Sequence, residues 1–213
     1  MELIRQLIDI VLHLDRHLDV IIRSYGLWAY ALLFAIVFAE TGLVVTPILP
    51  GDSLLFAAGA IASRGALDVW WLAGALVVAA IAGDAANYWI GHSIGARLVR
   101  GGQARYMKQE YLDRTHRFYE RHGARTIILA RFVPIVRTFA PFVAGLGTMT
   151  YARFARYNIV GGVAWIALFV FGGFYFGNLP MVKEHFSLVI LAVILVSFVP
   201  LAWSVVRERA GAA

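Results

Sequence analysis

Long apolar runs separated by short charged stretches make up most of the chain. Residues 157–182 and 185–206 contain no Asp, Glu, Lys or Arg, and each run exceeds the roughly 20 residues that a helix needs to cross a bilayer. Shorter apolar runs indicate further spans at 24–39 and at about 69–96. The pattern predicts an all-α polytopic membrane protein with about four transmembrane helices, the last two at 157–177 and 185–206.

Two further apolar segments, 40–63 and 126–150, contain residues that interrupt a continuous helix. These residues are Pro47, Pro50, Gly51, Pro134 and Pro141. Proline lacks the backbone N–H of a helix and clashes with the preceding turn, so each segment is expected to break. Non-helical backbone is tolerated at membrane depth only against protein or a water-filled cavity. We therefore expect the tips of both segments to line one cavity.

The distribution of basic residues indicates whether these segments cross the membrane or turn back. Residues 97–125 hold eight basic residues and three acids, which is most of the chain's net charge of +6. The positive-inside rule places this loop in the cytoplasm. Arg153 and Arg156 follow the second segment, and they join the cytoplasmic side only if that segment turns back. The sequence thus predicts two opposed re-entrant broken-helix hairpins, an arrangement typical of inverted-repeat transporters.

The chain ends and the composition complete the expected organisation. At 100° per residue, residues 1–23 place charged and apolar side chains on opposite sides, which predicts an amphipathic helix in the membrane interface. Residues 24–206 are expected to form a single membrane domain, and 207–213 a cytoplasmic tail. Charged residues make up 15% of the chain, against roughly 25% in soluble domains, so a soluble globule is excluded. The absence of cysteine excludes disulfides and thiolate metal sites.

Five ionisable residues interrupt the apolar segments. They are Glu40, Asp52, Asp84, Arg131 and Arg137. Each would cost roughly 2.5–3.5 kcal/mol at the membrane centre on insertion scales, so these groups must be paired, hydrated or close to an interface. One interpretation is a set of structural ion pairs, with the arginines reaching the lipid headgroups. The other interpretation is a functional site inside the membrane.

The three acids differ in their sequence context. Asp52 follows Pro50 and Gly51 and precedes an apolar run, so it is expected to N-cap the returning helix and to suit an ion or proton site there. Glu40 precedes the first turn and is expected to be hydrated at the outer mouth. In an apolar cavity either carboxyl is suited to proton exchange. Asp84 lies beside a stripe of small residues spaced four apart, so packing and function both stay open for it. The stripe consists of Gly83, Asn87, Gly91 and Gly95.

Other glycines and several aromatic residues are expected to serve packing or anchoring. The glycines interpreted as packing positions are Gly161, Gly162, Gly172, Gly173 and Gly177. The aromatic residues expected to be interface anchors or core are Trp70, Trp71, Trp89 and Tyr175.

The two arginines flank a proline, Pro134. A continuous helix would place Arg131 and Arg137 about 240° apart, whereas a break at the proline would let both turn toward one ligand. The planar donors of arginine suit phosphate better than an inorganic cation. The five groups together carry a formal charge of −1, counted from two arginines and three acids. Protonating two carboxyls would leave a positive site for a monoanionic phosphate headgroup, which motivates a proton-linked cycle.

The chain resembles the DedA family, also called the SNARE-associated Golgi or VTT-domain family, in four motifs. These are FAETG at 38–42, PILPGDS at 47–53, GD at 83–84 and RFVPIVRT at 131–138. The resemblance covers nearly the whole chain. It implies an integral inner-membrane protein with two re-entrant hairpins that serves membrane homeostasis, either as a flippase for undecaprenyl phosphate or as a phospholipid scramblase, dependent on proton motive force.

The same resemblance matches Glu40 and Asp52 to the family's functional acids, and Arg131 and Arg137 to its functional arginines. The expected function is therefore a transporter of a lipid phosphate in a bacterial inner membrane, with both termini in the cytoplasm. Membrane lipids, the phosphate headgroup and protons are the expected partners, self-association is left open, and nucleic acid is not expected.

Three other functions are weighed against transport of a lipid phosphate. A proton-coupled antiporter for small cations would use the acids, but two arginines in the same cavity do not suit it. A structural or chaperone-like membrane protein would act on other proteins without moving lipid. An enzyme is not expected because no nucleophile or metal stands beside a positioned base. No metal or other cofactor is expected.

Overall fold

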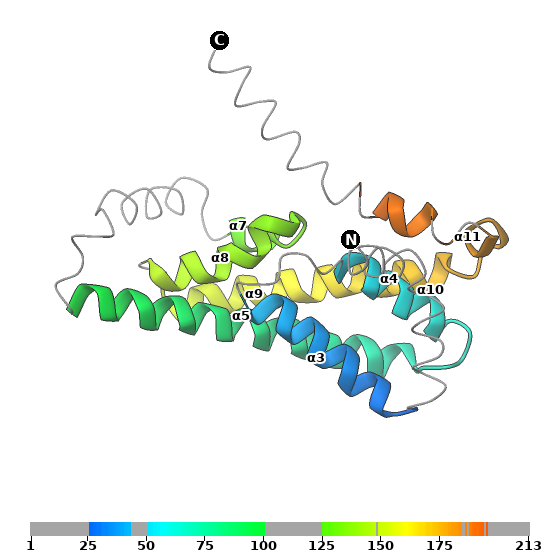
Figure 1. Ribbon diagram of the computed structural model, residues 1–213, viewed down its shortest axis with the longest axis horizontal. Helices are drawn as coiled ribbons and strands as arrows, with labels where there is room; N and C mark the ends of the chain where they lie inside the picture. The colour runs from blue at the N-terminus through cyan, green and yellow to red at the C-terminus, as the bar shows by residue number, and fades with distance from the viewer. Residues whose placement is uncertain are drawn as a thin grey trace, which may run out of the picture. The chain divides into compact units, whose positions relative to one another are not determined.

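The computed structural model describes residues 26–43, 51–100, 125–147, 149–184, 186, 188–193 and 195 (Figure 1). Its helices are α3 (Trp28–Gly42), α4 (Gly51–Ala62), α5 (Val69–Arg100), α7 (Arg125–Ala130), α8 (Pro134–Leu146), α9 (Tyr151–Ile166), the π-helix η2 (Ala167–Phe171), α10 (Gly172–Phe176) and α11 (Pro180–Glu184). Within these described residues there is no strand, so the prediction of an all-helical chain is confirmed there.

Two helical runs are long and apolar enough to cross a membrane. They cover Val69–Ile94 and Tyr151–Phe176, with 26 residues each, and they agree with the spans predicted at 69–96 and 157–177. The remaining apolar helices, among them α3 with 15 residues, are shorter than the roughly 20 residues of a perpendicular span.

Several predicted features lie wholly or mainly outside the described residues. They are the amphipathic helix at 1–23, the turn residues Pro47 and Pro50, most of the basic loop at 97–125, most of the last span at 185–206, and the tail at 207–213. These features, and the re-entrant geometry of the hairpins, stay predictions.

The chain forms two compact units, and we describe each by itself. Among the described residues, the first unit contains 26–35, 51–77 and the part from 165 onward. The second contains 36–43, 78–100, 125–147 and 149–164. The helices α3, α5 and α9 each contribute residues to both units.

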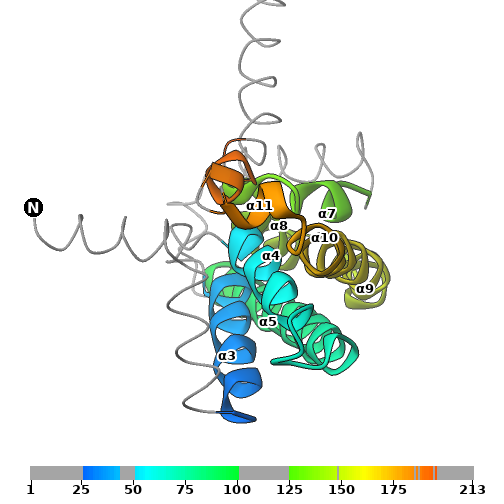
Figure 2. The same cartoon turned by 90° about the vertical axis from the view of Figure 1, so that its right-hand side faces the viewer.

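In the first unit, α4 is the central helix. All 12 of its residues are buried, as expected for a helix whose residues after Ser53 are all apolar or glycine. It packs against η2 and α10 (Figure 2). The approach is close enough that a Cβ on Gly59 would collide with the carbonyl of Val170, and one on Gly173 with the carbonyl of Phe56.

The start of α5 is also set within the first unit. The Asp68 carboxylate accepts hydrogen bonds from the backbone N–H groups of Trp70 and Trp71, at 2.9 and 3.0 Å. These are N–H groups of the first turn, which have no acceptor within the helix. The Tyr30 hydroxyl accepts a third hydrogen bond, from the backbone N–H of Asp68, at 2.8 Å. Asp68 therefore caps α5 and ties its start to α3.

The second unit has a small aromatic and aliphatic core. Its buried members are Tyr88, Ile127, Ala130, Ala140, Ala144 and Phe154. The rings of Tyr88 and Phe154 stack with centroids 4.7 Å apart, and the Tyr88 hydroxyl donates a 2.6 Å hydrogen bond to the carbonyl of Met149. This core joins α5, α7, α8 and α9 around the polar residues described below.

The predicted break at Pro134 is present. Three hydrogen bonds of the i to i+3 type, from the N–H groups of residues 131, 132 and 133, close the end of α7. Val133 is extended, with φ −121° and ψ 106°, as the residue before a proline prefers. Pro134 then begins α8, where its missing N–H removes no helical bond.

Pro141 does not break the second segment, contrary to the prediction. It lies inside α8, which continues to Leu146. A proline there removes only the N–H that would bond the carbonyl four residues earlier, which belongs to Arg137.

In the first broken segment, α3 ends at Gly42 and α4 begins at Gly51. Gly51, which was predicted to interrupt a continuous helix, is thus the first residue of α4.

The glycine stripe of α5 is a packing surface, as predicted. A Cβ on Gly83 would collide with Thr41 Oγ1 and the carbonyl of Phe38, and one on Gly91 with the carbonyl of Phe142. In α10 the prediction holds for only one of two adjacent glycines. Gly173 packs on α4, but a Cβ on Gly172 would meet no described atom within 4 Å.

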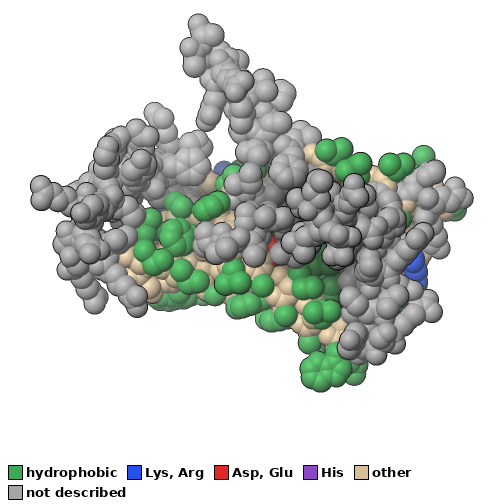
Figure 3. All heavy atoms as spheres, viewed as in Figure 1, with side chains coloured by type: hydrophobic (Ala, Val, Ile, Leu, Met, Phe, Trp, Pro, Cys, Tyr) green, Lys and Arg blue, Asp and Glu red, His purple; other side chains and the backbone are tan. Residues whose placement is uncertain are grey.

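Large apolar side chains are common on the described surface. The view in Figure 3 shows them spread over the helices, with few charged side chains among the described residues. Trp70, Trp71, Trp89 and Tyr175, predicted to be interface anchors or core, are all exposed. Exposed aromatic residues are typical of the zone where membrane proteins meet headgroups, so the core interpretation is wrong for these four.

The two adjacent glycines of α10 provide a matched stability test. Gly173→Ala should lower the thermal unfolding midpoint, because its methyl group would meet the backbone of α4. Gly172→Ala should leave the midpoint unchanged or raise it, because alanine favours a helix over glycine by about 1 kcal/mol. Thermal unfolding in detergent measures both, and equal midpoints would contradict the packing described here.

Candidate functional site

The five ionisable residues singled out by the sequence are all buried. Glu40, Asp52, Asp84, Arg131 and Arg137 are each at most 9% exposed, and within the described part of the chain they are the only charged residues in the buried class. Four of them lie in the second unit, whereas Asp52 lies in the first. The burial excludes full hydration as the way in which their charges are accommodated.

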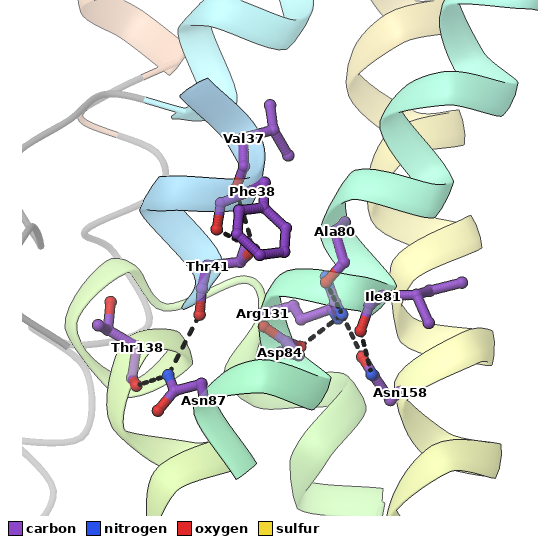
Figure 4. A network of polar contacts seen from close by, with 10 residues as sticks. All are labelled: Val37, Phe38, Thr41, Ala80, Ile81, Asp84, Asn87, Arg131, Thr138 and Asn158. Atoms are coloured by element: carbon purple, nitrogen blue, oxygen red, sulfur yellow. Dashed lines mark hydrogen bonds and ion pairs between the residues drawn. The ribbon is translucent and has the colours of Figure 1, made fainter. Parts of the chain in front are cut away.

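Arg131 forms the centre of a polar network in the second unit (Figure 4). It stands in the turn between α7 and α8, and its Nη2 atom donates to Asp84 Oδ2 on α5, at 2.5 Å. The same atom donates to Asn158 Oδ1 on α9. Asn158 in turn donates from Nδ2 to the carbonyl of Ile81 at 3.1 Å. Arg131 is therefore held from both long helical runs.

Two glycines of α9 make room for the Arg131 side chain. A Cβ on Gly161 would lie 3.1 Å from Arg131 Cδ, and a Cβ on Gly162 would lie 3.5 Å from Nη2. The first distance is tighter than an ordinary van der Waals contact, so the arginine side chain uses space that a larger residue would fill. These glycines are packing positions, as predicted. Both pack against the Arg131 side chain, and Gly162 also packs against the side chain of Ile81.

Arg137 pairs with a different carboxylate. It lies in the first turn of α8, where its N–H bonds the carbonyl of Val133 at 2.9 Å, and its Nη2 atom donates to Glu40 Oε1. Glu40 lies in the last turn of α3. The prediction of a hydrated Glu40 before the turn is therefore wrong, because this carboxylate is 2% exposed and paired with an arginine. In these two ion pairs, the arginines therefore contact separate acids.

Helix dipoles make the Glu40–Arg137 pair unusual. A negative charge at a helix C-terminus and a positive charge at a helix N-terminus each oppose the macrodipole, by roughly 0.3–1 kcal/mol at exposed sites. Glu40 and Arg137 occupy these two unfavourable ends. Each charge therefore offsets the unfavourable interaction of the other charge with its own helix dipole. An anion other than Glu40 would find the same attraction at the start of α8, from the dipole and from Arg137 together.

Asn87 connects the two segments that carry this pair. It is fully buried on α5, and its Nδ2 atom donates to the carbonyls of Thr41, at 3.1 Å, and Thr138, at 2.8 Å. Figure 4 shows the amide between α3 and α8, with Asp84, the partner of Arg131, one turn away on α5. Asp84 and Asn87 are three residues apart, so they share one face of α5.

Asp52 has a different type of partner in the first unit. Its Oδ1 atom accepts a 2.8 Å hydrogen bond from Nε1 of Trp165, and both side chains are buried. Asp52 was predicted to precede its helix as the N-cap. Because α4 already begins at Gly51, Asp52 lies inside the first turn instead. A carboxylate there still has a favourable interaction with the helix dipole.

Sequence reasoning missed Asn158 and Trp165, and it treated Asn87 only as a member of a packing stripe. Asn158 is an amide in an otherwise apolar span, so the cost of burying an amide without a partner could have singled it out. For Trp165 the only signal was a lone indole N–H in the same span. A buried tryptophan usually finds a hydrogen-bond acceptor, but the sequence does not show which one.

The fold and the site together define a class: a helical membrane protein in which buried arginines are neutralised by carboxylates of other helices. The VTT domain matches residues 49–175. The chain is 52% identical to Protein DedA of Escherichia coli (strain K12), over 100% of this chain and 98% of that protein. It is 31% identical to inner membrane protein YqjA of the same strain, over 73% of this chain and 71% of that protein.

An uncharacterized membrane protein of Mycobacterium leprae (strain TN) is 42% identical, over 86% of this chain and 85% of the relative. No solved structure matches the chain significantly. The protein is thus a membrane protein that belongs to the DedA family, whose members carry the VTT domain.

The Arg131–Asp84 pair predicts a non-additive effect on stability. Asp84→Leu or Arg131→Met alone should lower the unfolding midpoint strongly, because an isolated buried charge remains; in soluble proteins this costs about 3–5 kcal/mol. The double variant should unfold closer to the wild type than either single variant does, because no buried charge is left. Thermal unfolding in detergent measures this difference.

The control for that experiment is Arg156→Met, because Arg156 is an exposed arginine of α9. It should change the midpoint little. If the decreases in the unfolding midpoint of the two single variants simply added in the double variant, the result would contradict an energetic coupling between Arg131 and Asp84.

Proposed function

We propose that this protein is a proton-linked transporter, acting as a flippase or scramblase, for a lipid phosphate such as undecaprenyl phosphate or a phospholipid. The observation that carries the proposal is the pair of buried arginines on either side of Pro134, each neutralised by a carboxylate of another helix. Membership of the DedA family agrees with a membrane activity, but the names of the relatives specify no substrate.

Phosphate suits this end of α8 for three physical reasons. Arg131 and Arg137 offer planar, charge-assisted donors that match phosphate oxygens. The N-terminus of α8 adds the positive end of a helix dipole. Burial lowers the local dielectric constant, which strengthens both attractions. In the structure, the Glu40 and Asp84 carboxylates are paired with the arginines. An incoming phosphate would therefore compete with these carboxylates for the guanidinium groups.

Proton linkage follows from the fate of the displaced carboxylates. The two ion pairs, Arg131–Asp84 and Arg137–Glu40, together carry no net formal charge. If phosphate takes an arginine from its acid, the acid must gain a proton or face the cost of an unpaired buried charge. Glu40 and Asp84 are the acids that this exchange would protonate. We assign Asp52 the same proton-handling role within the first unit, where Trp165 holds it.

The lipid tail need not enter the protein. A headgroup site that is open toward the bilayer would let an acyl or prenyl chain stay in the membrane, which avoids exposing that chain to water at about 25 cal/mol per Å². The relative YqjA is named an inner membrane protein, and we propose the inner membrane as the location here as well. The cytoplasmic orientation of both termini is part of the same proposal.

The proton-coupled cation antiporter fits the site less well. A cation would have to replace an arginine at Glu40 or Asp84, and it would leave that arginine buried without its carboxylate. A cation flux driven by a pH gradient in proteoliposomes, together with no lipid movement, would favour the antiporter. Movement of lipid in vesicles that contain only this protein and pure lipid would exclude a purely structural or chaperone-like role.

The arginines provide the direct test of the proposal. Arg131→Ala and Arg137→Ala should each slow the movement of a fluorescent prenyl phosphate across proteoliposome membranes by roughly 10- to 100-fold, because hydrogen bonds to charged groups contribute about 1.5–3 kcal/mol. Lysine at either position should retain part of the rate, because it keeps the charge but not the planar donors.

Arg156→Ala is the matched control, since Arg156 is exposed and lies outside the site, and it should transport at close to the wild-type rate. Unchanged rates in both Arg131→Ala and Arg137→Ala, with folded protein, would remove these residues from the site and contradict the proposal.

A further inference from the structure

Asn87 holds together the backbone on which the Glu40–Arg137 pair is built. One of its two acceptors is the carbonyl of Thr41, which directly follows Glu40, and the other is the carbonyl of Thr138, which directly follows Arg137. The ion pair and the amide therefore bridge the same two segments at adjacent residues. Asn87 itself contacts neither charged side chain through these bonds.

The chemistry of the amide suits this bridging position. Thr41 lies in the last turn of α3, where carbonyls have no N–H partner within the helix, so Asn87 satisfies a helix end from a neighbouring helix. An NH2 group supplies two donors from one atom, whereas a hydroxyl supplies one and an ionised carboxylate supplies none. Within the described part of the chain, the Oδ1 atom of Asn87 is buried and accepts no hydrogen bond, so the contribution of the amide comes from its two donated bonds.

The packing around Asn87 supports the same role. Gly83 and Gly91 lie four residues before and after it, and they let α5 approach the backbone of α3 and of α8, respectively. Close contact on both sides leaves the amide little freedom to move. Both bonds end on backbone carbonyls and neither involves the charged groups of Glu40 or Arg137, so a change of anion at Arg137 would remove neither a donor nor an acceptor.

We propose that Asn87 is a positioning residue for Arg137. It keeps the end of α3 and the first turns of α8 in register while carboxylate and phosphate exchange on the guanidinium. Without the amide, α8 would be free to shift against α3, and Arg137 would present its donors to phosphate less often in the productive geometry. This inference rests on the proposed function, and it adds a residue that the family resemblance does not supply.

The test measures binding of farnesyl monophosphate to the full-length protein in detergent. Asn87→Ser, which keeps at most one donor, and Asn87→Leu, which keeps none, should weaken binding by about tenfold, in line with the loss of one to two hydrogen bonds. The loss should vanish in an Arg137→Ala background, where there is no guanidinium to position. It should persist in an Arg131→Ala background.

Asn158 is the matched control. It is also a buried asparagine of the second unit, but it contacts Arg131. Asn158→Ser should therefore weaken binding in the Arg137→Ala background and have no effect on binding in the Arg131→Ala background. A general loss of stability would weaken binding equally in every background, and that result would overturn the positioning role. Equal binding by the wild type, Asn87→Ser and Asn87→Leu would overturn it as well.

A second readout separates this inference from the proposed function. If the wild type binds neither farnesyl monophosphate nor phosphatidic acid, the transport proposal fails, and thermal unfolding alone then decides the role of Asn87. Positioning predicts that the effects of Asn87→Ser and Arg137→Ala on the unfolding midpoint are non-additive, whereas those of Asn87→Ser and Arg131→Ala add. If the effect of Asn87→Ser on the unfolding midpoint adds to that of Arg137→Ala as well as to that of Arg131→Ala, the positioning role is overturned.

Discussion

The structure depends on one constraint, which is the cost of burying charge in an apolar protein. A charge at membrane depth is tolerated when another group neutralises or solvates it, and each of the five buried charged residues has such a partner. Arg131 meets Asp84, Arg137 meets Glu40, and Asp52 meets the Trp165 indole. Much of the second unit follows from bringing these groups together: α5 supplies the acid and the amide, and α9 supplies an asparagine and two small residues beside Arg131.

The same pairs that stabilise the protein also limit what its site can bind. A site whose arginines are already neutralised attracts an anion only by exchange, so binding is linked to the fate of the displaced acid. The Glu40–Arg137 pair is suited to such exchange because both members sit at helix ends whose dipoles oppose their charges. Replacing the carboxylate by a phosphate would keep the favourable contact at α8, and protonation of the displaced Glu40 would remove its unfavourable charge from the end of α3. In the proposed transport cycle, proton linkage would follow from this electrostatic exchange.

Much of this arrangement could be predicted from the chain alone, because charge in an apolar segment is a strong signal. The five buried charges, the break at Pro134 and the packing role of Gly83 and Gly91 were all accessible in this way. The partners were not, because pairing depends on contacts between residues far apart in the sequence, 97 positions for Glu40 and Arg137 and 113 for Asp52 and Trp165. A pattern of residue types could not show that the two arginines would choose different acids.

The errors of prediction have physical causes too. Glu40 was placed in water because it precedes a turn, but α3 continues through it to Gly42 and carries it into the protein. Pro141 was expected to contribute to a break, yet a proline inside a helix removes one hydrogen bond and the surrounding packing can compensate. Asp52 was expected before its helix, but α4 starts one residue earlier. Boundaries of this kind depend on tertiary contacts that local sequence does not encode.

In the proposed transport cycle, phosphate and carboxylate compete for the same arginines. Calorimetric titration of farnesyl monophosphate into the protein, repeated in buffers of different ionisation enthalpy, measures the protons taken up per ligand bound. Net uptake should fall by up to about one proton in Glu40→Gln, because the titration of the phosphate itself contributes equally to both proteins. Binding with the same proton count in the wild type and in Glu40→Gln would contradict it.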